Sequence, residues 1–511
     1  MPDRLAQVSG IGDPATLQRV HIVGIGGAGM SGIATVLVAM GHEVTGSDLH
    51  ESAVTERLVA QGVAVTIGHR SDIVAGADLV THSTAVRSDN PERAEAVRRG
   101  IPVVPRADVL AAVAALRRCI AVAGTHGKTT TSSMLALMLV EAGLRPSFLI
   151  GGDVKEIGTN AVWDEGEWIV VEADESDGTF LHLHPEIAVV TNVEADHLDH
   201  FGTFDAVRSA FAEFLDSVSG TRVVCGDDAE AAGLGRAAGA ALVGMDVDAQ
   251  WRISDVVAAR GRSRFALRQD GDSVGHSGSD SGVDSGVDSV GDSGSGFEHD
   301  GDERHGEGSS GSGHRLDVDL AVPGLHNVRN ASVAAVAALA AGASDEAVVR
   351  ALGRFGGVAR RFELRGEEAG ITFVDDYAHL PTEVRATLAA AADGGWGRIV
   401  AVFQPHRYSR TAEVGQDFGP AFGDADLIVI TDVYAAGEAP IAGISGRTVA
   451  DAVARHHPAE HLRYLPDRSR LAVELVDLLQ PGDLCLSLGA GDLTSLADEI
   501  LAVLRADGSA R

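Results

Sequence analysis

The 511-residue chain has few cysteines, no long apolar run and little positive charge, and each scarcity excludes a class of function. Its three cysteines, Cys119, Cys225 and Cys485, lie far apart, which argues against a disulfide framework or a zinc site and fits a reducing cytoplasm. No apolar run is long enough to span a bilayer, and the first twenty residues lack a signal-type apolar core. The formal net charge of -32 argues against nucleic acid or an anionic membrane surface as the main partner.

Lysine is scarcer still, because the chain contains only Lys128 and Lys155. Lys128 stands in "AGTHGKTTT", residues 123 to 131, directly after an apolar run. The stretch ends like a phosphate-binding loop of the form G-x-x-x-x-G-K-[ST], but its first glycine, Gly124, comes two positions late. Strand, glycine turn, Lys-Thr and helix nevertheless follow in the order that a phosphate loop requires. We therefore interpret the stretch as a shortened phosphate loop and not as a chance match.

Such a loop predicts a triphosphate site with a metal ion beside it. Backbone N–H groups of residues 125 to 129 would surround phosphate oxygens, Lys128 would neutralise their charge, and Thr129 would offer its hydroxyl to Mg²⁺. Two later strand-like runs end in ligand-type side chains, "VVEADESD" and "TNVEADHLDH". Carboxylates at strand ends near a phosphate loop suit Mg²⁺. Since alternation puts Glu172 and Asp174 on one face, spacing leaves the choice between them open.

A second glycine-rich turn, "GIGGAGMSG" at residues 24 to 32, lies between a predicted strand and a predicted helix. Glycines let the backbone approach a diphosphate, and the helix N-terminus offers it free N–H groups. Asp48, at the end of the next predicted strand, stands where nucleotide-binding domains often place an acid for a ribose. By itself the pattern favours a nicotinamide dinucleotide, and a tight turn without a ligand is the alternative.

Short apolar runs alternate with helix-like stretches along most of the chain, which predicts an α/β protein with parallel sheets wrapped by helices. We expect three domains: a Rossmann-like domain at 1–106, a P-loop ATPase-like domain at 107–357 and a second Rossmann-like domain at 358–511. Residues from about 270 to 314 are almost entirely Ser, Gly, Asp, Glu and His, which predicts a disordered acidic loop. The strand-like stretches on either side would pair as a hairpin, with the loop inserted at its tip.

Several stretches together resemble the Mur ligases in their order and approximate spacing. They are "GTHGKTTT", "EADESD", "TNVEADHLDH", "GLHNVRNASVA", "ARRF" and "DDYAHLPTE". The stretches "QPHRYSRT" and "DVYAAGEAPI" resemble in particular the members that add L-alanine. The resemblance covers essentially the whole chain outside the N-terminal tail and the acidic loop. It implies that the shortened loop binds ATP, and that the N-terminal domain holds the UDP part of a sugar nucleotide and not a nicotinamide.

The reaction that the resemblance implies is the ATP-dependent ligation of L-alanine to the lactyl carboxylate of UDP-N-acetylmuramate, in peptidoglycan precursor synthesis. The carboxylate would attack the γ-phosphate to give an acyl phosphate, and the amine would then displace phosphate. ATP and Mg²⁺, a cytoplasmic location, a monomer or homodimer, and no membrane or nucleic-acid partner are expected. A murein-peptide ligase, which joins a preformed tripeptide, is the nearest alternative. A nicotinamide oxidoreductase and a non-catalytic UDP-sugar-binding regulator are more distant ones.

The resemblance also implies roles for individual residues. The catalytic residues would be Lys128, Glu172 and His197. Thr129 with Glu172 would hold a first Mg²⁺ ion, and His197 would be a ligand of a second. ATP contacts are implied for Gly124, Thr125, His126, Gly127, Lys128, Thr129, Thr130, Asn327, Asn330, Arg361 and Asp376. Contacts to the UDP-sugar are implied for Gly24, Gly26, Gly27, Gly29, Met30, Asp48, Ser83 and Thr84. The amino-acid side of the cleft is assigned to His379, His406, Arg407, Asp432, Tyr434 and Glu438.

The sequence departs from the family pattern at two points. Several Mur ligases use a carbamylated lysine near the second metal ion, but no lysine follows Lys155 here. Leu380 stands where relatives commonly have a second histidine, after His379, which puts any role of that histidine in doubt. Because the expected sites lie at domain junctions, we expect an open-to-closed motion during turnover.

Overall fold

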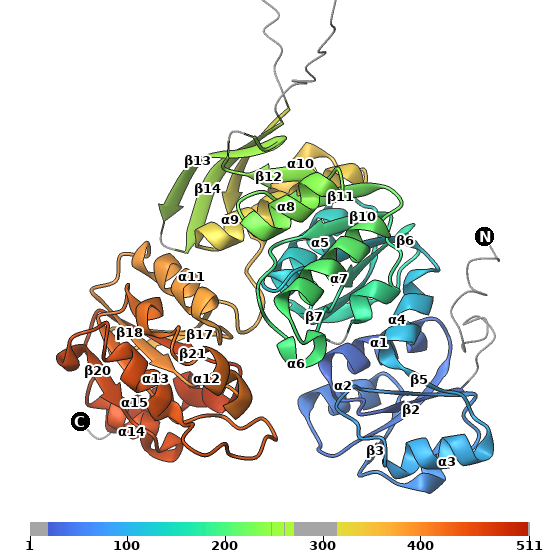
Figure 1. Cartoon of the computed structure of the whole chain (residues 1–511), viewed down its shortest axis with the longest axis horizontal. Helices are drawn as coiled ribbons and strands as arrows, with labels where there is room; N and C mark the ends of the chain where they lie inside the picture. Colours follow the sequence, from blue (N-terminus) through green and yellow to red (C-terminus); the bar gives the residue numbers. More distant parts are fainter. Residues whose placement is uncertain (1–18, 177, 247, 260, 270–313, 509–511) are drawn as a thin grey trace, which may run out of the picture.

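The structure, a computed structural model, describes residues 19–176, 178–246, 248–259, 261–269 and 314–508. The predicted acidic loop lies outside the described residues, apart from His314 at its end. Three sheets follow one another along the chain, each covered by helices (Figure 1). The exact domain limits at residues 106 and 357 stay a prediction. Within the described ranges, no helix is long and apolar enough to cross a membrane.

The N-terminal sheet has the strand order β3-β2-β1-β4-β5, and its strands pair in parallel. Its strands are β1 (Arg19–Val23), β2 (Glu43–Asp48), β3 (Ala64–Ile67), β4 (Leu79–His82) and β5 (Val103–Pro105). Its helices are α1 (Ala28–Ala39), α2 (Ala53–Ala60), α3 (Pro91–Arg99) and α4 (Arg106–Ala114). The order reverses at β1, so a crevice for ligands opens beyond the carboxyl ends of β1 and β4. The glycine turn lies at that point.

The central sheet has ten strands in the order β15-β14-β13-β12-β11-β10-β6-β9-β7-β8. They are β6 (Arg118–Ala123), β7 (Ser147–Val154), β8 (Thr159–Val162), β9 (Trp168–Glu172), β10 (Ile187–Val190), β11 (Thr221–Cys225), β12 (Ala241–Gly244), β13 (Trp251–Ala259), β14 (Arg262–Gln269) and β15 (Arg315–Leu320). The helices are α5 (Lys128–Glu141), α6 (Leu198–Phe201), α7 (Phe204–Asp216), α8 (Ala229–Ala237), α9 (Leu325–Ala340) and α10 (Asp345–Arg354). The phosphate loop connects β6 to α5, near the middle of this sheet.

Burial explains the apolar sequence of the central domain. Strand β6 and its neighbours β9 and β10 are buried on both faces, as expected for parallel strands that read as continuous apolar runs. Helix α5 is buried from Thr130 to Leu139 because α9 and α10 cover its outer side. The predicted hairpin is confirmed, since β14 and β15 pair in antiparallel register with Arg268 opposite Arg315.

The C-terminal sheet has the order β16-β17-β21-β18-β19-β20, with only the edge strand β16 antiparallel. Its strands are β16 (Glu363–Glu368), β17 (Ile371–Asp376), β18 (Arg398–Phe403), β19 (Leu427–Ile430), β20 (Leu462–Tyr464) and β21 (Asp483–Leu488). Its helices are α11 (Pro381–Ala392), α12 (Tyr408–Val414), α13 (Gly446–Val453), α14 (Leu471–Val476) and α15 (Leu496–Gly508).

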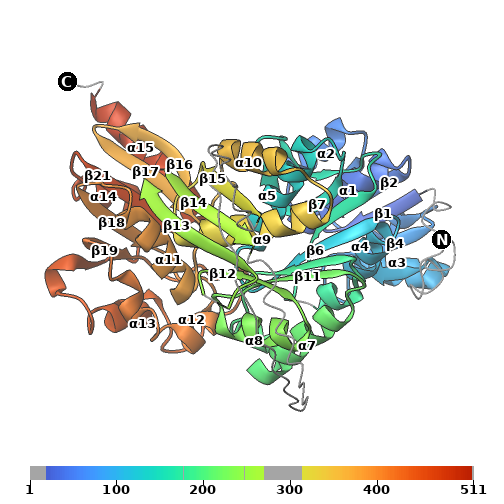
Figure 2. The same cartoon turned by 90° about the horizontal axis from the view of Figure 1, so that it is seen from above.

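The central domain lies between the other two, and Figures 1 and 2 show one flanking domain on each side of it. Helix α1 packs on β7 and β8, and Nδ2 of Asn160 donates to the carbonyl oxygen of Ala28 over 3.3 Å. On the other side α11 packs against α9, and Val154 forms an isolated antiparallel bridge with Val358. Both flanking domains therefore contact elements next to the phosphate loop.

Candidate active site

The phosphate loop turns sharply between β6 and α5, and two glycines allow the turn. Gly124 and Gly127 have φ angles of 138° and 79°, a region that favours glycine. A Cβ at Gly127 would lie 2.6 Å from Oδ1 of Asn330, and one at Gly124 would collide with Thr191. Helix α5 begins at Lys128, so its first backbone N–H groups have no partner inside the helix. A helix N-terminus behind such a turn is a site for a phosphate group.

Lys128 folds back over this turn. Its Nζ donates to the carbonyl oxygen of Gly124 over 2.7 Å, to that of Thr125 over 3.3 Å, and to Oε1 of Glu175 over 2.7 Å. Burial acts to lower the pKa of Lys128, but the charges of Glu175 and Asp174 outweigh it and raise that pKa. The lysine is therefore a buried cation within the loop, as a site for anionic phosphate requires.

Glu172 and Thr129 lie in contact, as the predicted metal site requires. Glu172 ends β9, and its Oε1 accepts the Thr129 hydroxyl over 2.9 Å while Oε2 accepts the backbone N–H of Gly151 over 2.7 Å. Asp174 has a different partner, because its Oδ2 accepts a hydrogen bond from Nη2 of Arg106 over 2.8 Å. The structure thus distinguishes two carboxylates that the sequence left equivalent.

His197 lies at the start of α6, with a φ of 55°. Its Nε2 is 3.4 Å from Oδ2 of Asp196 and 3.8 Å from Oε1 of Glu175. Burial lowers the pKa of His197, which favours the neutral ring that binds metal ions. Burial also raises the pKa of Glu175, to about 7. The sequence motif contained Glu175, but nothing in its spacing singled it out as the partner of Lys128.

Mg²⁺ fits the pair formed by Thr129 and Glu172, and His197 belongs to the predicted second ion. Thr129 and Glu172 offer oxygen atoms in contact with each other, and His197 offers a neutral imidazole. Among the residues that the structure describes, no group of three His, Cys, Asp or Glu side chains could hold a metal ion alone. A protein contribution of one or two side chains is typical for Mg²⁺, which takes its other ligands from phosphate oxygens and water.

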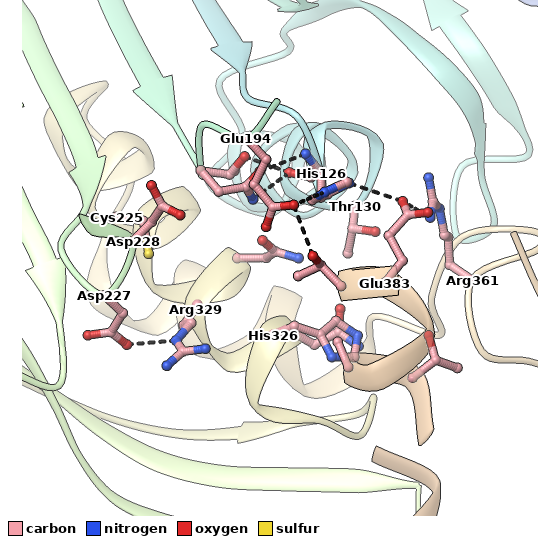
Figure 3. Close-up of a pocket in the computed structure, with 18 of the residues that line it drawn as sticks. His126, Thr130, Glu194, Cys225, Asp227, Asp228, His326, Arg329, Arg361 and Glu383 are labelled. Carbon is pink, nitrogen blue, oxygen red and sulfur yellow. Dashed lines mark hydrogen bonds and ion pairs between the residues drawn. The ribbon is translucent and has the colours of Figure 1, made fainter. Parts of the chain in front are cut away.

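A cavity next to the phosphate loop lies between the central and C-terminal domains (Figure 3). Seven of the residues predicted to contact ATP line it: His126, Gly127, Thr130, Asn327, Asn330, Arg361 and Asp376. Gly124, Thr125, Lys128 and Thr129 do not line this cavity. Residues that the sequence did not single out complete its wall, among them Cys225, Asp227, Arg329 and Glu383. The sequence did not indicate these residues because they lie on segments that come together only when the chain folds.

His126 joins the two domains across this cavity (Figure 3). Its Nε2 is 3.2 Å from Oε2 of Glu194, and its Nδ1 is 3.2 Å from Oε1 of Glu383 in α11. Burial acts to lower the pKa of His126, but the two carboxylates raise it to about 9. Thr382 donates to Glu194 over 3.0 Å, and Arg361 lies 3.6 Å from Glu383. A charged histidine between two carboxylates therefore holds the C-terminal domain against the phosphate loop.

The glycine turn of the N-terminal domain is arranged around Asp48. Oδ2 of Asp48 accepts the backbone N–H of Gly26 over 2.8 Å, and a Cβ at Gly26 would lie 2.9 Å from that oxygen. The backbone N–H of Ser83 donates to the carbonyl oxygen of Val23 over 3.1 Å, which places Ser83 beside the turn. The side chain of Met30 is buried in the core, so only its backbone can face a ligand.

A second cavity lies between this turn and the end of β9. Gly29 and Gly32 of the N-terminal domain, Arg106, and Glu172 and Asp174 of the central domain all line it. A Cβ at Gly29 would collide with Arg106, so the glycine permits this close approach. Sequence reasoning did not single out Arg106, since it lies outside the quoted motifs. The cavity therefore lies between the glycine turn and Glu172, the carboxylate that contacts Thr129 of the phosphate loop.

The residues predicted for the amino-acid side are only partly brought together. His406 stacks on Tyr434, with ring centroids 5.7 Å apart, and lies 5.9 Å from the ring of His379. The backbone N–H of Arg407 donates to the carbonyl oxygen of Tyr434 over 2.8 Å. The side chain of Asp432 is used differently, because Oδ1 accepts the backbone N–H of Gly446 over 2.7 Å at the start of α13.

Two more side chains on this face already have structural partners. Glu438 accepts the backbone N–H of Ser409 over 3.0 Å and its hydroxyl over 2.6 Å. Arg410, which was not predicted, lies 3.4 Å from both Nδ1 of His406 and Oδ1 of Asp196. Leu380, at the departure from the family pattern, is 7% exposed and buried before α11.

These features define a three-domain α/β protein of the P-loop class, with one cavity beside its phosphate loop and a second between the N-terminal glycine turn and Glu172. Family models match three successive parts of the chain. They are the Mur ligase family, catalytic domain, at residues 19–118, the Mur ligase middle domain at 122–275, and the Mur ligase, glutamate ligase domain, at 360–491. The chain belongs to the Mur ligase family.

Individual relatives match over nearly the whole chain. A protein of Saccharopolyspora erythraea named UDP-N-acetylmuramate--L-alanine ligase is 45% identical over 506 residues, which cover 97% of this chain and 95% of that protein. A Geobacter protein of the same name is 42% identical over 495 residues, 96% of this chain and 98% of that protein. The solved UDP-N-acetylmuramate-alanine ligase of Thermotoga maritima has a TM-score of 0.75 at 26% identity, covering 96% of this chain and 99% of that one. The predicted family and three-domain fold are confirmed.

Proposed function

We propose that the protein joins L-alanine to the lactyl carboxylate of UDP-N-acetylmuramate, with ATP converted to ADP and phosphate. The relatives named for this reaction, at 42% and 45% identity, support it over a murein-peptide ligase. The observation that carries the proposal is the second cavity, which is lined by both Gly29 of the glycine turn and Glu172 at the end of β9. A substrate held by its diphosphate at the turn can extend its carboxylate to the γ-phosphate through this cavity.

In this mechanism the protein first brings two anions together. The glycine turn and the start of α1 bind the diphosphate of the sugar nucleotide, and the phosphate loop with Lys128 binds the β- and γ-phosphates of ATP. Thr129 and Glu172 would hold one Mg²⁺ ion and His197 a second, and Mg²⁺ supplies charge neutralisation at the phosphates when bound. Lys128 lowers the repulsion between the carboxylate and the triphosphate, so that an acyl phosphate can form.

The second step places the amine of alanine next to this acyl phosphate. His379, His406 and Tyr434 lie together on the face of the C-terminal domain that carries α12, and Arg410 connects that face to Asp196 beside His197. We assign the amino-acid site to this face. The lowered pKa of His406, about 4, results from burial together with the nearby charges of His379 and Arg410, and it keeps the ring neutral at pH 7.

The remaining predictions belong to the same proposal. The nucleotide base of ATP would occupy the cavity lined by Asn327 and Asn330, and Arg361 would approach it from the C-terminal domain. It also includes the domain limits at 106 and 357, a cytoplasmic monomer or homodimer, and the absence of nucleic-acid or membrane partners.

Phosphate release from ATP tests the proposal directly. We expect release only when ATP, Mg²⁺, UDP-N-acetylmuramate and L-alanine are all present, and loss of release when any one is omitted. Glycine, L-serine and the tripeptide are offered in place of alanine in parallel reactions. Faster release with the tripeptide than with L-alanine would favour the murein-peptide ligase, and release independent of the sugar nucleotide would refute both.

A further inference from the structure

Arg106 connects the N-terminal domain to the central domain at the second cavity. It is the first residue of α4, directly after β5, and its side chain is 17% exposed. Its Nη2 donates to Oδ2 of Asp174, in the segment after β9, over 2.8 Å. Its Nη1 lies against the glycine turn, because a Cβ added at Gly29 would collide with this atom. A single guanidinium group therefore reaches both the glycine turn and the acidic segment that follows β9.

The glycine turn has no positively charged side chain of its own. Residues 24 to 32 contain neither lysine nor arginine. Helix α1 begins at Ala28, so the backbone N–H groups of its first turn have no partner inside the helix and supply only a partial positive charge. Of the described residues that line the second cavity, only Arg106 is a lysine or an arginine. Arg106 is therefore placed to supply the full charge that a diphosphate at this turn needs.

The direction of the substrate decides which of the two phosphates Arg106 can reach. In the proposed function the sugar extends from the glycine turn toward Glu172, through the second cavity. The β-phosphate carries the sugar, so it lies on the cavity side of the turn. The α-phosphate carries the nucleoside and lies on the other side. Since Arg106 lines the cavity, the β-phosphate is the nearer of the two.

The ion pair with Asp174 orients the arginine for this contact. A guanidinium group is planar and carries five N–H donors, so it can bind two acceptors on different edges. Asp174 holds the group through Nη2, and Nη1 is directed at Gly29. The two carboxylates after β9 thus have separate partners, because Glu172 accepts the hydroxyl of Thr129.

We infer that Nη1 of Arg106 binds the β-phosphate of the sugar nucleotide, and that Asp174 is the positioning residue that orients the guanidinium group. The inference rests on the proposed function, which supplies the diphosphate. A hydrogen bond from arginine to phosphate is charge-assisted and among the stronger ones in proteins. It is made equally in the bound substrate and in the transition state, so its loss raises KM and changes kcat little.

Calorimetric titration of the full chain with UMP and with UDP tests the contact. We expect Arg106→Met to bind UDP about 10- to 100-fold more weakly than wild type and to bind UMP within about twofold of it. Arg106→Lys keeps the charge without the planar group and should recover only part of the loss. Arg57→Met is the matched control, because Arg57 pairs with Asp153 across the same two domains over 3.0 Å and is not among the described residues that line the second cavity. Its affinity for UDP should stay within about twofold of wild type.

Two sugar nucleotides distinguish the β-phosphate from the lactyl carboxylate as the group that Arg106 binds. UDP-N-acetylglucosamine has the same diphosphate and a similar sugar without the lactyl carboxylate. We expect Arg106→Met to weaken its binding by the same factor as the binding of UDP-N-acetylmuramate. A loss confined to UDP-N-acetylmuramate would show that Arg106 binds the carboxylate, and it would overturn the inference.

The role of Asp174 needs a measurement that a merely structural ion pair would not affect. In ³¹P spectra of bound UDP, we expect Arg106→Met and Asp174→Asn each to shift the resonance of the β-phosphorus and to leave that of the α-phosphorus in place. Asp174→Asn should weaken UDP binding in the wild-type background and have no further effect in Arg106→Met, because it acts through the arginine. An independent effect in the double variant overturns the positioning role. If Asp174→Asn does not fold, Asp174→Glu, which keeps the charge but displaces it, takes its place in both measurements.

The outcomes separate this inference from the proposed function. If wild type binds UDP and Arg106→Met binds it equally well with an unshifted β-phosphorus, the inference is overturned and the proposed function stays intact. A wild-type protein that binds neither UDP nor UDP-N-acetylmuramate overturns the proposed function and this inference with it.

Discussion

Among single residues, the pair formed by Lys128 and Glu175 couples the chemistry of the phosphate loop to its stability. Their side chains are 14% and 3% exposed and 2.7 Å apart. A buried cation that loses its partner is strongly destabilising, whereas an intact pair contributes little net stability. The pair keeps the lysine charged inside the protein, where a triphosphate would compete for the same donors.

We therefore expect Lys128→Met to lower the ligation rate by a factor of about 100 or more, since transition-state charge is no longer neutralised. It should also destabilise the fold by about 3 kcal/mol, because Glu175 stays buried without a cation. Burial raises the pKa of Glu175 and Lys128 acts to lower it, so the variant raises that pKa further; Glu175 takes up a proton as the pH falls, and the loss of stability shrinks with it. Urea unfolding at several pH values measures this.

Two further variants control the experiment. The double variant Lys128→Met/Glu175→Gln should recover most of the stability and none of the activity. Lys155→Met removes the only other lysine, which pairs with Glu363 at the surface, and should keep the rate within about twofold. Normal ligation by Lys128→Met would contradict the assigned role.

Thr129 offers a second test at the same scale. Thr129→Val removes the hydroxyl that contacts Glu172, and we expect the Mg²⁺ concentration for half-maximal rate to rise about tenfold, with recovery in Thr129→Ser. Thr131→Val is the matched control in the same helix, because the Thr131 hydroxyl is buried and has no hydrogen-bond partner among the described residues. An equal effect of both valine variants would contradict a metal-related role for Thr129.

Among elements, the contact between the phosphate loop and α11 depends on pH. His126 is held between Glu194 and Glu383, with Arg361 and His379 also near Glu383. Its pKa rises from an ordinary 6.5 to about 9 on folding. The stabilisation is complete below pH 6.5, where the unfolded histidine is also charged, and it is lost as the pH rises through about 9.

We expect the melting temperature of ligand-free wild-type protein to exceed that of His126→Gln most at pH 6.5 and below. The difference should shrink between pH 6.5 and about 9, and it corresponds to at most on the order of 3 kcal/mol. Thermal unfolding across this range measures it. His182→Gln is the control, because that histidine is about half exposed and pairs with Asp108 in a different part of the molecule. A constant difference between wild type and His126→Gln would contradict the charged bridge.

At the scale of the whole molecule, residues 270–313 separate two strands that already pair. The backbone N–H of Gln269 donates to the carbonyl oxygen of His314 over 2.8 Å, which closes the ladder between β14 and β15. Since Arg268 lies opposite Arg315, a two-residue turn fits the register of this hairpin. The hairpin lies at the edge of the central sheet, at the end away from β6.

Replacement of residues 270–313 by Asn-Gly should therefore leave the ligation rate and both substrate KM values within about twofold, because loop length has a weak effect on stability. The melting temperature should change by only a few degrees. Replacement by Pro-Pro, which cannot form the same turn, is the control and should lower the melting temperature. A strong loss of activity in a stable Asn-Gly variant would assign the segment a function.

The sequence predicted those parts of the site that local geometry determines. Gly124, Gly127 and Lys128 are neighbours in the chain, so their spacing was enough to predict the turn and the helix behind it. The choice of Glu172 over Asp174 by family resemblance agrees with its contact to Thr129, but the spacing gave no reason for it. Asp432 was assigned to the cleft, whereas its side chain binds the start of α13, a direction that depends on a neighbouring loop.

By itself, the sequence determined the family, the three α/β domains, the hairpin around the insertion and the phosphate loop, because these depend on local apolar pattern, glycine spacing and motif order. Only the tertiary structure decided that Glu175 pairs with Lys128, that His126 meets Glu383 from 257 positions away, and that Arg106 pairs with Asp174. The physical reason is that side-chain direction, burial and charge partners arise where distant segments pack together, and no local pattern encodes those contacts.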